Sequence, residues 1–181
     1  MTNDPAAAGG LRTVKASDVY VRRNTFTRCQ GTLSLRVADR VLVQENVFDG
    51  GGVTNAGGVF SSGAGHVIFG NTFRDLRSPK NQYWWAMAFA AANVEALKDD
   101  PAGVARTRNV VVARNRFERT DSRIAVGTYP TAAFSLLPEG LRVVGNVFTG
   151  TAATSPFDWL APDPTGAMTR SIVESGNRFE P

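Results

Sequence analysis

The stretch that decides the fold is KASDVYVRRNTFTRCQGTLSLRVADRVLVQENVF, residues 15–48, because it contains one phrase twice. The phrase is a short run of β-branched and apolar residues, two further residues, an asparagine, any residue and a phenylalanine. It occurs at residues 19–26 (VYVRRNTF) and again at residues 41–48 (VLVQENVF). Four more copies follow, at residues 67–73, 110–117, 143–148 and 172–179. Six Asn-x-Phe copies in 181 residues identify the chain as a repeat protein.

The spacing of the repeated asparagines indicates a β-solenoid. They stand at positions 24, 46, 71, 115, 146 and 177, so successive gaps are 22, 25, 44, 31 and 31 residues. Solenoid rungs built from short strands have about 20 to 30 residues. We therefore expect the gap of 44 to span two rungs, the middle one marked by the apolar run at residues 86–90. The sequence predicts an all-β, single-stranded right-handed parallel β-helix of about seven rungs over residues 13–181, with residues 1–12 as a leader or truncated edge.

The repeated positions also predict how the interior is filled. The residue three before the asparagine is Val or Ile in five copies and Glu174 in the sixth, and β-branched residues suit an inward-facing strand position. We expect the phenylalanines to stack along the interior and the asparagine amides to bond to the rungs above and below. A second strand is expected after each phenylalanine, as in residues 33–35, 59–60 and 124–126. Glu174 indicates a polar final layer, whereas the first copy has no such residue, which predicts an upstream β-helix segment or a second chain there.

Composition narrows the function classes. A hydrophobic fraction of 43% argues against disorder, and no apolar run approaches the length of a membrane span. One Cys excludes an internal disulfide, and one His with one Cys argues against a structural zinc site. The net charge of +4 suits an anionic partner without identifying it.

Lys15 and Arg36 are the candidate catalytic residues. Lys15 lies nine residues before Asn24 and Arg36 ten before Asn46, which predicts that both occupy the same place in consecutive rungs, about 5 Å apart along the axis. Two like charges that close depress each other's proton affinity. Such a lysine can act as a base near neutral pH, with the arginine neutralising or relaying charge. The alternative is that both are ordinary solvated residues of the solenoid.

Other side chains are candidates for substrate binding, each with a structural alternative. His66 is the only histidine and could act as a base or pack on a turn. Tyr83, Trp84 and Trp85 could stack on sugar rings or cover the flank of the solenoid. Arg22 could reach a groove and pair with a carboxylate or sulfate.

Longer runs of the chain resemble a known family. Residues 14–50 (VKASDVYVRRNTFTRCQGTLSLRVADRVLVQENVFDG) and 57–76 (GGVFSSGAGHVIFGNTFRDL) look like the core of polysaccharide lyase family 6, the chondroitinase B and alginate lyase family. Residues 107–120 and 136–150 resemble it more weakly. The resemblance implies a pectate-lyase-like β-helix, of which this chain would be the C-terminal part.

The resemblance also implies a chemistry. The family cleaves uronate-containing polysaccharides of the alginate or chondroitin/dermatan type by β-elimination, so Lys15 would be the base and Arg36 the acid. A bound Ca²⁺ would neutralise the sugar carboxylate, but residues 6–11 (AAAGGL), where its ligands should stand, offer no hard oxygen side chains. The flanks Val14 and Ala16, and Val37 after the arginine, also depart from the family pattern.

Three functions remain open from the sequence. The first is a polysaccharide lyase, and the second is a non-catalytic or truncated β-helix that binds acidic polysaccharide. The third is a structural β-helix such as a tail fibre. We expect an acidic polysaccharide as the partner, with no nucleic acid and no membrane. The resemblance implies a secreted or periplasmic protein, although residues 1–10 show no signal peptide.

Overall fold

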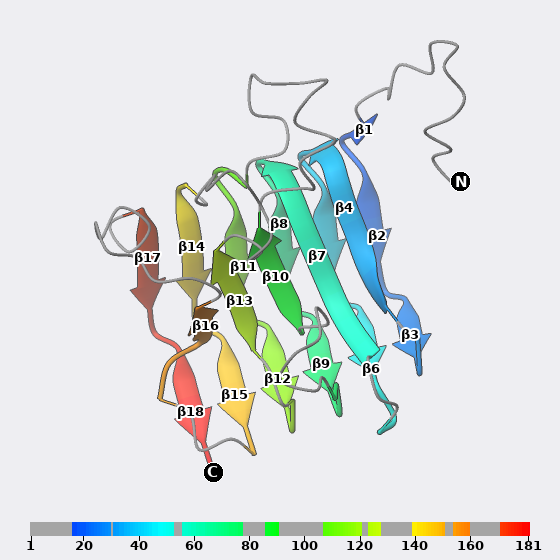
Figure 1. Ribbon diagram of the computed structural model, residues 1–181, viewed down its shortest axis with the longest axis vertical. Helices are drawn as coiled ribbons and strands as arrows, with labels where there is room; N and C mark the ends of the chain where they lie inside the picture. Colours follow the sequence, from blue (N-terminus) through cyan, green and yellow to red (C-terminus); the bar gives the residue numbers. More distant parts are fainter. Residues whose placement is uncertain are drawn as a thin grey trace.

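The computed structural model describes nine stretches of the chain, and they are built from β-strands. The described residues are 16–29, 31–52, 56–77, 86–90, 107–120, 123–127, 139–150, 154–159 and 171–181. Tyr83, Trp84 and Trp85 lie outside them, as does Lys15. Figure 1 shows the strands running side by side from one end of the molecule to the other.

The strands form three parallel sheets of six strands each among the described residues. Sheet A contains β1 (Ala16–Ser17), β4 (Gly31–Asp39), β7 (Ala56–Ala64), β10 (Met87–Ala90), β13 (Ile124–Gly127) and β16 (Phe157–Trp159). Sheet B contains β2 (Tyr20–Arg22), β5 (Leu42–Gln44), β8 (Val67–Phe69), β11 (Val111–Ala113), β14 (Leu141–Val144) and β17 (Ile172–Ser175). Sheet C contains β3 (Thr25–Thr27), β6 (Val47–Asp49), β9 (Thr72–Arg74), β12 (Arg116–Glu118), β15 (Val147–Thr149) and β18 (Arg178–Glu180).

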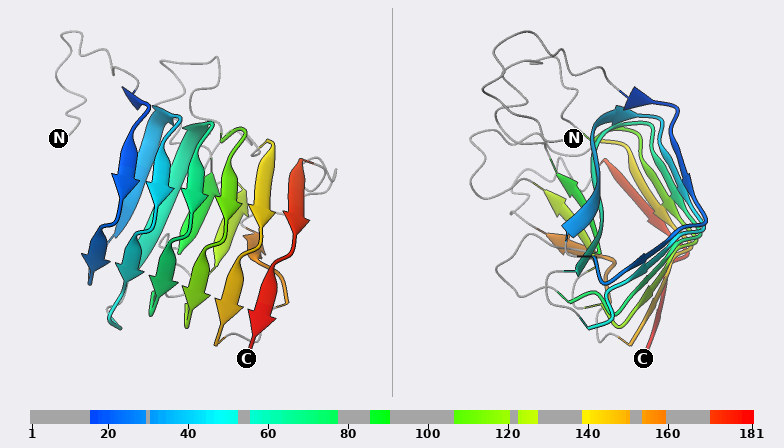
Figure 2. Two further views of the ribbon diagram at one scale, coloured as in Figure 1. Left: turned by 180° about the vertical axis from the view of Figure 1, so that it is seen from behind. Right: turned by 90° about the vertical axis from the view of Figure 1, so that its right-hand side faces the viewer.

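The chain visits sheets A, B and C in turn, and each such circuit is one rung. Every strand pairs in parallel with the equivalent strand of the next rung, as in β2 with β5 and β5 with β8. This is the right-handed parallel β-helix predicted from the sequence. Viewed along the axis, sheets B and C meet at one sharp corner and sheet A lies opposite (Figure 2).

The described part of the chain forms six rungs, one fewer than the approximate prediction, because the gap of 44 residues is a single rung. β9 pairs directly with β12, and the Phe73 and Phe117 rings stack 5.0 Å apart. The apolar run at residues 86–90 includes β10, which is the sheet A strand of that same rung. Length alone suggested two rungs, but a long connection within one rung accounts for it.

The predicted asparagine ladder is present at the corner between sheets B and C. The backbone N–H and the Nδ2 of Asn71 both donate to Oδ1 of Asn115, each at 2.9 Å. Nδ2 of Asn115 in turn donates to the Ile68 carbonyl at 2.9 Å and to Oδ1 of Asn146 at 3.0 Å. The four inner asparagines are almost completely buried, so the ladder satisfies the polar groups that the corner would otherwise leave unpaired.

The predicted phenylalanine stack fills the interior behind sheet C. Neighbouring rings lie 4.6–5.0 Å apart and within 12° of parallel, a spacing set by the strand separation of about 4.8 Å. The stack contains Phe26, Phe48, Phe73, Phe117, Phe148 and Phe179. Inward-facing residues of sheets A and B, such as Val59, Ile68 and Ile124, complete the core and have no exposed surface.

Candidate functional site

Arg36 lies in β4 of sheet A, in the same rung as the corner residue Arg40. β1, which begins directly after Lys15, pairs with the end of β4 through Ala16 and Ala38. Lys15 itself lies outside the described residues, so its predicted distance from Arg36 stays a prediction. The paired residues Ala16 and Ala38 are 22 residues apart in the sequence, whereas Lys15 and Arg36 are 21 residues apart.

A β-bulge at Arg36 is the structural feature that singles out this part of sheet A. Leu35 pairs with Ser61, but Ala38 pairs with Gly63, so two residues of β4 stand opposite one residue of β7. The two are Arg36 and Val37. β-Bulges redirect a side chain relative to the regular ladder and are common beside active sites. A second register shift lies nearer the start of β4, between Gly31 and Leu33.

Gly63 and Asp39 bring β4 and β7 into close contact next to the bulge. Gly63 has φ of 128°, a conformation that favours glycine, and a Cβ there would lie 1.9 Å from the Ala38 carbonyl oxygen. The Ala64 backbone N–H donates to Oδ1 of Asp39 at 2.9 Å. Close contact between the two backbones therefore requires glycine at this position, and sequence inspection did not single it out.

His66 is in the interior and not on a substrate-binding surface, so its assignment as a candidate binding residue is wrong. Its side chain has no exposed surface. Nδ1 of His66 accepts a hydrogen bond from the Val41 backbone N–H at 3.2 Å. The ring therefore satisfies a buried backbone donor where the chain enters β5 of the preceding rung, which is the packing alternative considered from the sequence.

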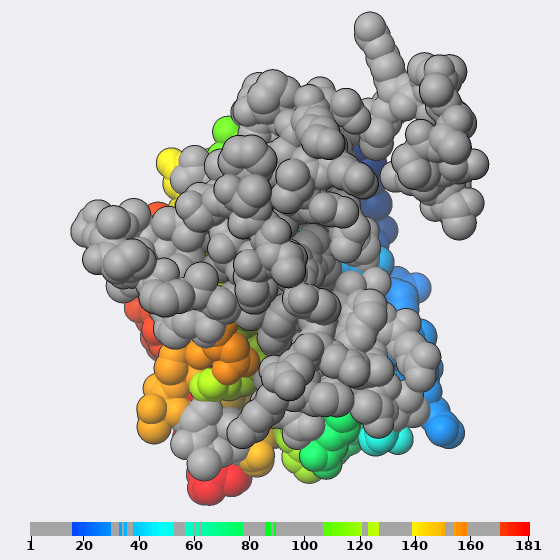
Figure 3. Space-filling model, viewed as in Figure 1, coloured from blue at the N-terminus to red at the C-terminus, as the bar shows by residue number. Residues whose placement is uncertain are grey.

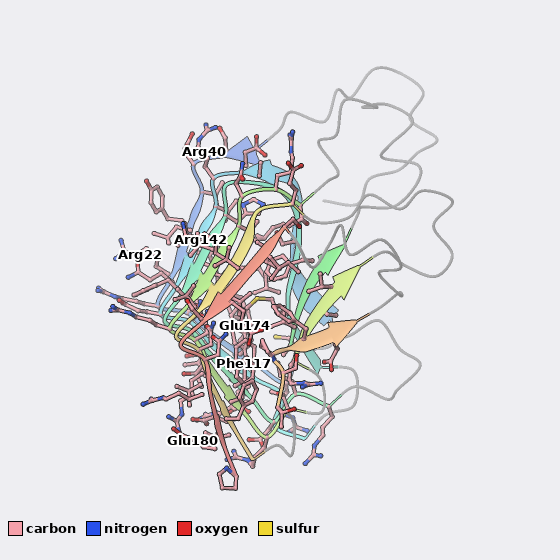
Figure 4. All side chains as sticks on the ribbon, turned by 90° about the vertical axis from the view of Figure 1, so that its left-hand side faces the viewer. Arg22, Arg40, Phe117, Arg142, Glu174 and Glu180 are labelled. Atoms are coloured by element: carbon pink, nitrogen blue, oxygen red, sulfur yellow. The ribbon has the colours of Figure 1, made fainter. Side chains whose placement is uncertain are left out.

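Arg22 is exposed and lies at the end of β2 in sheet B. Its register neighbour in the next rung is Gln44, and it points away from the interior (Figure 4). Arg36 is in sheet A, so the structure places these two candidates on different sheets. Arg23 at the adjacent corner pairs with Glu45, with Nε and Oε2 2.8 Å apart. Substrate binding by Arg22 stays a prediction.

Opposite charges stack at the corners of consecutive rungs, a feature that the sequence reasoning missed. Arg40 forms a two-pronged ion pair with Asp18, with distances of 2.7 and 2.6 Å, and its hydrogen bond lowers the pKa of the Asp18 carboxyl. Both residues have positive φ and stand directly before the apolar run of their repeat. The signal was therefore available: equal repeat positions in neighbouring rungs carry opposite charges.

Residues 6–11, where the resemblance places the calcium ligands, lie outside the described residues, so calcium binding stays a prediction. The described residues contain no group of three or more Asp, Glu, His or Cys side chains placed to hold a metal ion. We therefore derive no step through calcium. Within the same part of the chain, no helix is long and apolar enough to cross a membrane.

Comparisons with known proteins agree with the parallel β-helix fold described above. The sequence matches the family model described as Chondroitinase B over residues 11–136, and no curated protein matches the chain. Among solved structures, it is similar to a mannuronic acid specific polysaccharide family 6 lyase from human gut microbiota, with a TM-score of 0.66 and 19% identity over 86% of this chain. The alginate lyase AlyGC gives a TM-score of 0.69 with 18% identity over 90% of this chain. A further alginate lyase, in complex with a trisaccharide, gives 0.65 with 13% identity over 91%.

The chain spans only part of each of these structures, namely 33%, 21% and 36% of their lengths in the same order. Their similarity supports the parallel β-helix fold. The family model covers well over half of this chain, including the positions of Lys15 and Arg36. The chain therefore belongs to the chondroitinase B family, polysaccharide lyase family 6.

Proposed function

We propose that this chain carries the base and the acid of a polysaccharide lyase that cleaves a uronate-containing polymer by β-elimination, with alginate as the preferred candidate. The observation that carries the proposal is the β-bulge at Arg36, one of two register shifts in the described sheets, which falls at a residue with an assigned role in the family pattern. The family match over residues 11–136 supports the same reading.

In the proposed reaction, Lys15 takes the proton from C5 of the uronate at the cleavage site. The electron pair of that C–H bond forms the C4–C5 double bond as the bond between C4 and the linking oxygen breaks. Arg36 gives a proton to the departing oxygen, so no water is consumed. The acidity of the C5 proton depends on neutralising the neighbouring carboxylate, and the described residues supply no cation site for this.

The register of sheet A supports the pairing of the two residues. The β1–β4 offset of 22 residues and the Lys15–Arg36 separation of 21 differ by one. Extending the β1–β4 register by one residue would place Lys15 opposite Val37, the second residue of the bulge between β4 and β7.

Unsaturated products of β-elimination absorb near 235 nm, which gives a direct assay. Purified protein is incubated with alginate, dermatan sulfate and chondroitin sulfate, with and without added Ca²⁺. We expect a rise in absorbance that is lost in Lys15→Ala and Arg36→Ala. Arg40→Ala is the matched control, because it removes an arginine of the same strand end whose ion pair with Asp18 is exposed. Equal loss in this control would contradict a specific role for Arg36.

Binding of acidic polysaccharide without cleavage is the second candidate function. The departures from the family pattern favour it: Val14 and Ala16 flank the lysine, and Val37 follows the arginine. Titration calorimetry with alginate oligosaccharides separates the two. Binding with no absorbance change in the wild type supports this candidate.

We further propose that the protein exerts either function outside the cytoplasm.

A further inference from the structure

The outer face of sheet B is largely apolar. Val43, Ile68 and Val112 point inward and are buried, so the strand residues on either side of each point outward. One outward row runs in register from rung to rung and consists of Tyr20, Leu42, Val67, Val111, Arg142 and Val173. Four large apolar side chains are exposed among the described residues, and all four lie in strands of sheet B or directly before one: Val19, Tyr20, Val67 and Val173. Apolar surface gathered on one face marks an interaction site.

This face is separate from the proposed acid, Arg36, which lies in β4 of sheet A. The left view of Figure 2 shows the strands of sheet B in front, whereas Figures 1 and 3 view the molecule from the side of sheet A. Val67, Val111 and Arg142 belong to the inner strands β8, β11 and β14. The character of the face therefore does not depend on the first or last strand of the sheet.

The outer face of sheet B also carries positive charge. Arg22 and Arg142 occupy outward strand positions and are exposed, and both lie on the outer side of the sheet (Figure 4). Within the described part of the chain, neither arginine forms an ion pair, and no outward position of a sheet B strand is acidic. Glu45, at the neighbouring corner, pairs with Arg23 and accepts a hydrogen bond from Gln44.

Sheet C treats its outward charges differently. Nη2 of Arg74 lies 2.7 Å from Oδ2 of Asp49, and Arg116 pairs with Glu118. Two of the three outward arginines of sheet C, namely Arg74 and Arg116 but not Arg178, thus have carboxylate partners within the described chain. The arginines of sheet B have none, so that face can accept carboxylates from a ligand.

Apolar surface and unpaired arginines together fit an acidic polysaccharide. One face of a pyranose ring is apolar and packs against aromatic and aliphatic side chains, while ring carboxylates pair with guanidinium groups. Phe69 supplies an aromatic ring beside the apolar row, with the Arg114 guanidinium 5.8 Å from its centroid. A second copy of the same face fits poorly, because it would bury the arginines of both copies without a carboxylate.

We propose that the outer face of sheet B is a second binding surface for acidic polysaccharide, separate from the residues proposed to cleave it. Arg22 and Arg142 are four strands apart in the order of sheet B, which is about 19 Å. They bind carboxylates at the two ends of this distance, and the apolar row between them contacts the sugar rings. The inference takes its ligand class from the proposed function and adds a surface that keeps the polymer on the protein.

The first test is titration calorimetry with alginate oligosaccharides in an Arg36→Ala background, which lacks the proposed acid on sheet A. We expect Arg22→Ala combined with Arg142→Ala to raise the dissociation constant at least about tenfold. Arg116→Ala combined with Arg178→Ala is the matched control, because it removes the same two charges from sheet C. It should change the dissociation constant less than about twofold. Equal weakening by both double variants, or no binding in the Arg36→Ala background, would overturn the proposal.

The second test changes the charge in the middle of the face. Val67 is 36% exposed in β8, so Val67→Glu and Val67→Lys should both fold, which circular dichroism checks. We expect Val67→Glu to weaken alginate binding at least about tenfold and Val67→Lys to bind at least as tightly as the wild type. Equal weakening by the two variants would overturn the role of the positive charge.

Further probes separate the ligand class and the lyase activity from the binding surface. Polyglutamate has carboxylates but no sugar rings, and equally tight binding of polyglutamate and alginate would overturn the assignment to a polysaccharide. The absorbance assay near 235 nm reports on cleavage independently. Binding that depends on Arg22 and Arg142, without cleavage, would support this inference and contradict the lyase proposal. Cleavage by a chain whose polymer binding ignores both arginines would do the reverse.

Discussion

Asn115→Ala is the sharpest test of how the solenoid corner is stabilised. The Asn115 side chain accepts two hydrogen bonds from Asn71 and donates one to the Ile68 carbonyl and one to Asn146. Nδ2 of Asn71 keeps its bond to the Val43 carbonyl when Asn115 is truncated. The Asn71 backbone N–H loses its acceptor and stays buried, which costs about 1–3 kcal/mol.

The lost hydrogen bonds add to this penalty, at about 0.5–1.5 kcal/mol for each one that water does not replace. We therefore expect Asn115→Ala to lower the free energy of unfolding by about 2–4 kcal/mol. Urea unfolding followed by circular dichroism measures the change, provided that the dependence on urea stays the same.

Asn24→Ala is the control within the same ladder. Its Nδ2 donates two comparable hydrogen bonds, to the Arg22 carbonyl and to Asn46, but the residue is exposed and water can replace them. We expect a loss of at most about 1 kcal/mol. Equal losses in Asn24→Ala and Asn115→Ala would refute the argument that the asparagine ladder stabilises the fold because its hydrogen bonds are buried.

Three further changes test the interior and the corners. Phe117→Ala should cost about 3–5 kcal/mol in unfolding free energy, because it leaves a cavity between two stacked rings; a loss below about 1 kcal/mol would contradict this. His66→Phe should cost about 1–3 kcal/mol by leaving the Val41 N–H without its acceptor, and His66→Asn, which retains an acceptor, should cost less. The Arg119 guanidinium lowers the pKa of the Asp75 carboxyl. The ion pair therefore stabilises the fold at pH values above the pKa of unfolded aspartate, about 3.9. This stabilisation is lost as the pH falls through the lower pKa of Asp75 in the folded protein. Urea unfolding should therefore show wild type and Asp75→Asn differing by at most about 1 kcal/mol at pH 7 and converging below about pH 4; a difference that persists at low pH would contradict the assignment.

Much of the fold was predictable because a solenoid repeats its inward-facing residues. Each Asn-x-Phe fixes a corner and an interior ring, and the β-branched residue three positions earlier fixes which face of sheet B is buried. The pattern did not reveal that Asn-x-Phe itself lies at the start of a strand, as in β12 after Asn115. The predicted count of two rungs across the gap of 44 residues was wrong, because the length of a connection is independent of the rung that it interrupts.

The candidate site was less predictable, because a site depends on departures from the repeat. His66 was a candidate because it is the only histidine in the sequence. In the structure, its ring accepts a hydrogen bond from the Val41 backbone N–H of the preceding rung. Gly63 is one of 18 glycines and becomes special only through its close approach to the Ala38 carbonyl. Neither relation is visible in the spacing of the motifs.

The bulge in β4 resolves a conflict in the sequence. Leu35 and Ala38 are both buried, with 6% of each exposed, although residues three apart lie on opposite faces of a regular strand. One extra residue lets both face the interior. Among the described strand pairs, register shifts occur between β4 and β7 alone, and one of the two falls at the residue proposed as the acid.

Deletion of Val37 tests whether the bulge serves the fold or the site. Without Val37, Leu35 and Ala38 stand two apart and still face the interior, so we expect the circular dichroism spectrum to be retained and the unfolding midpoint to change little. The rate of β-elimination should fall to background, because Arg36 then occupies a regular ladder position. Val37→Ala keeps the chain length and should keep the activity. A deletion variant that remains active would show that the bulge does not position Arg36, and one that unfolds would show that the extra residue is needed by sheet A itself.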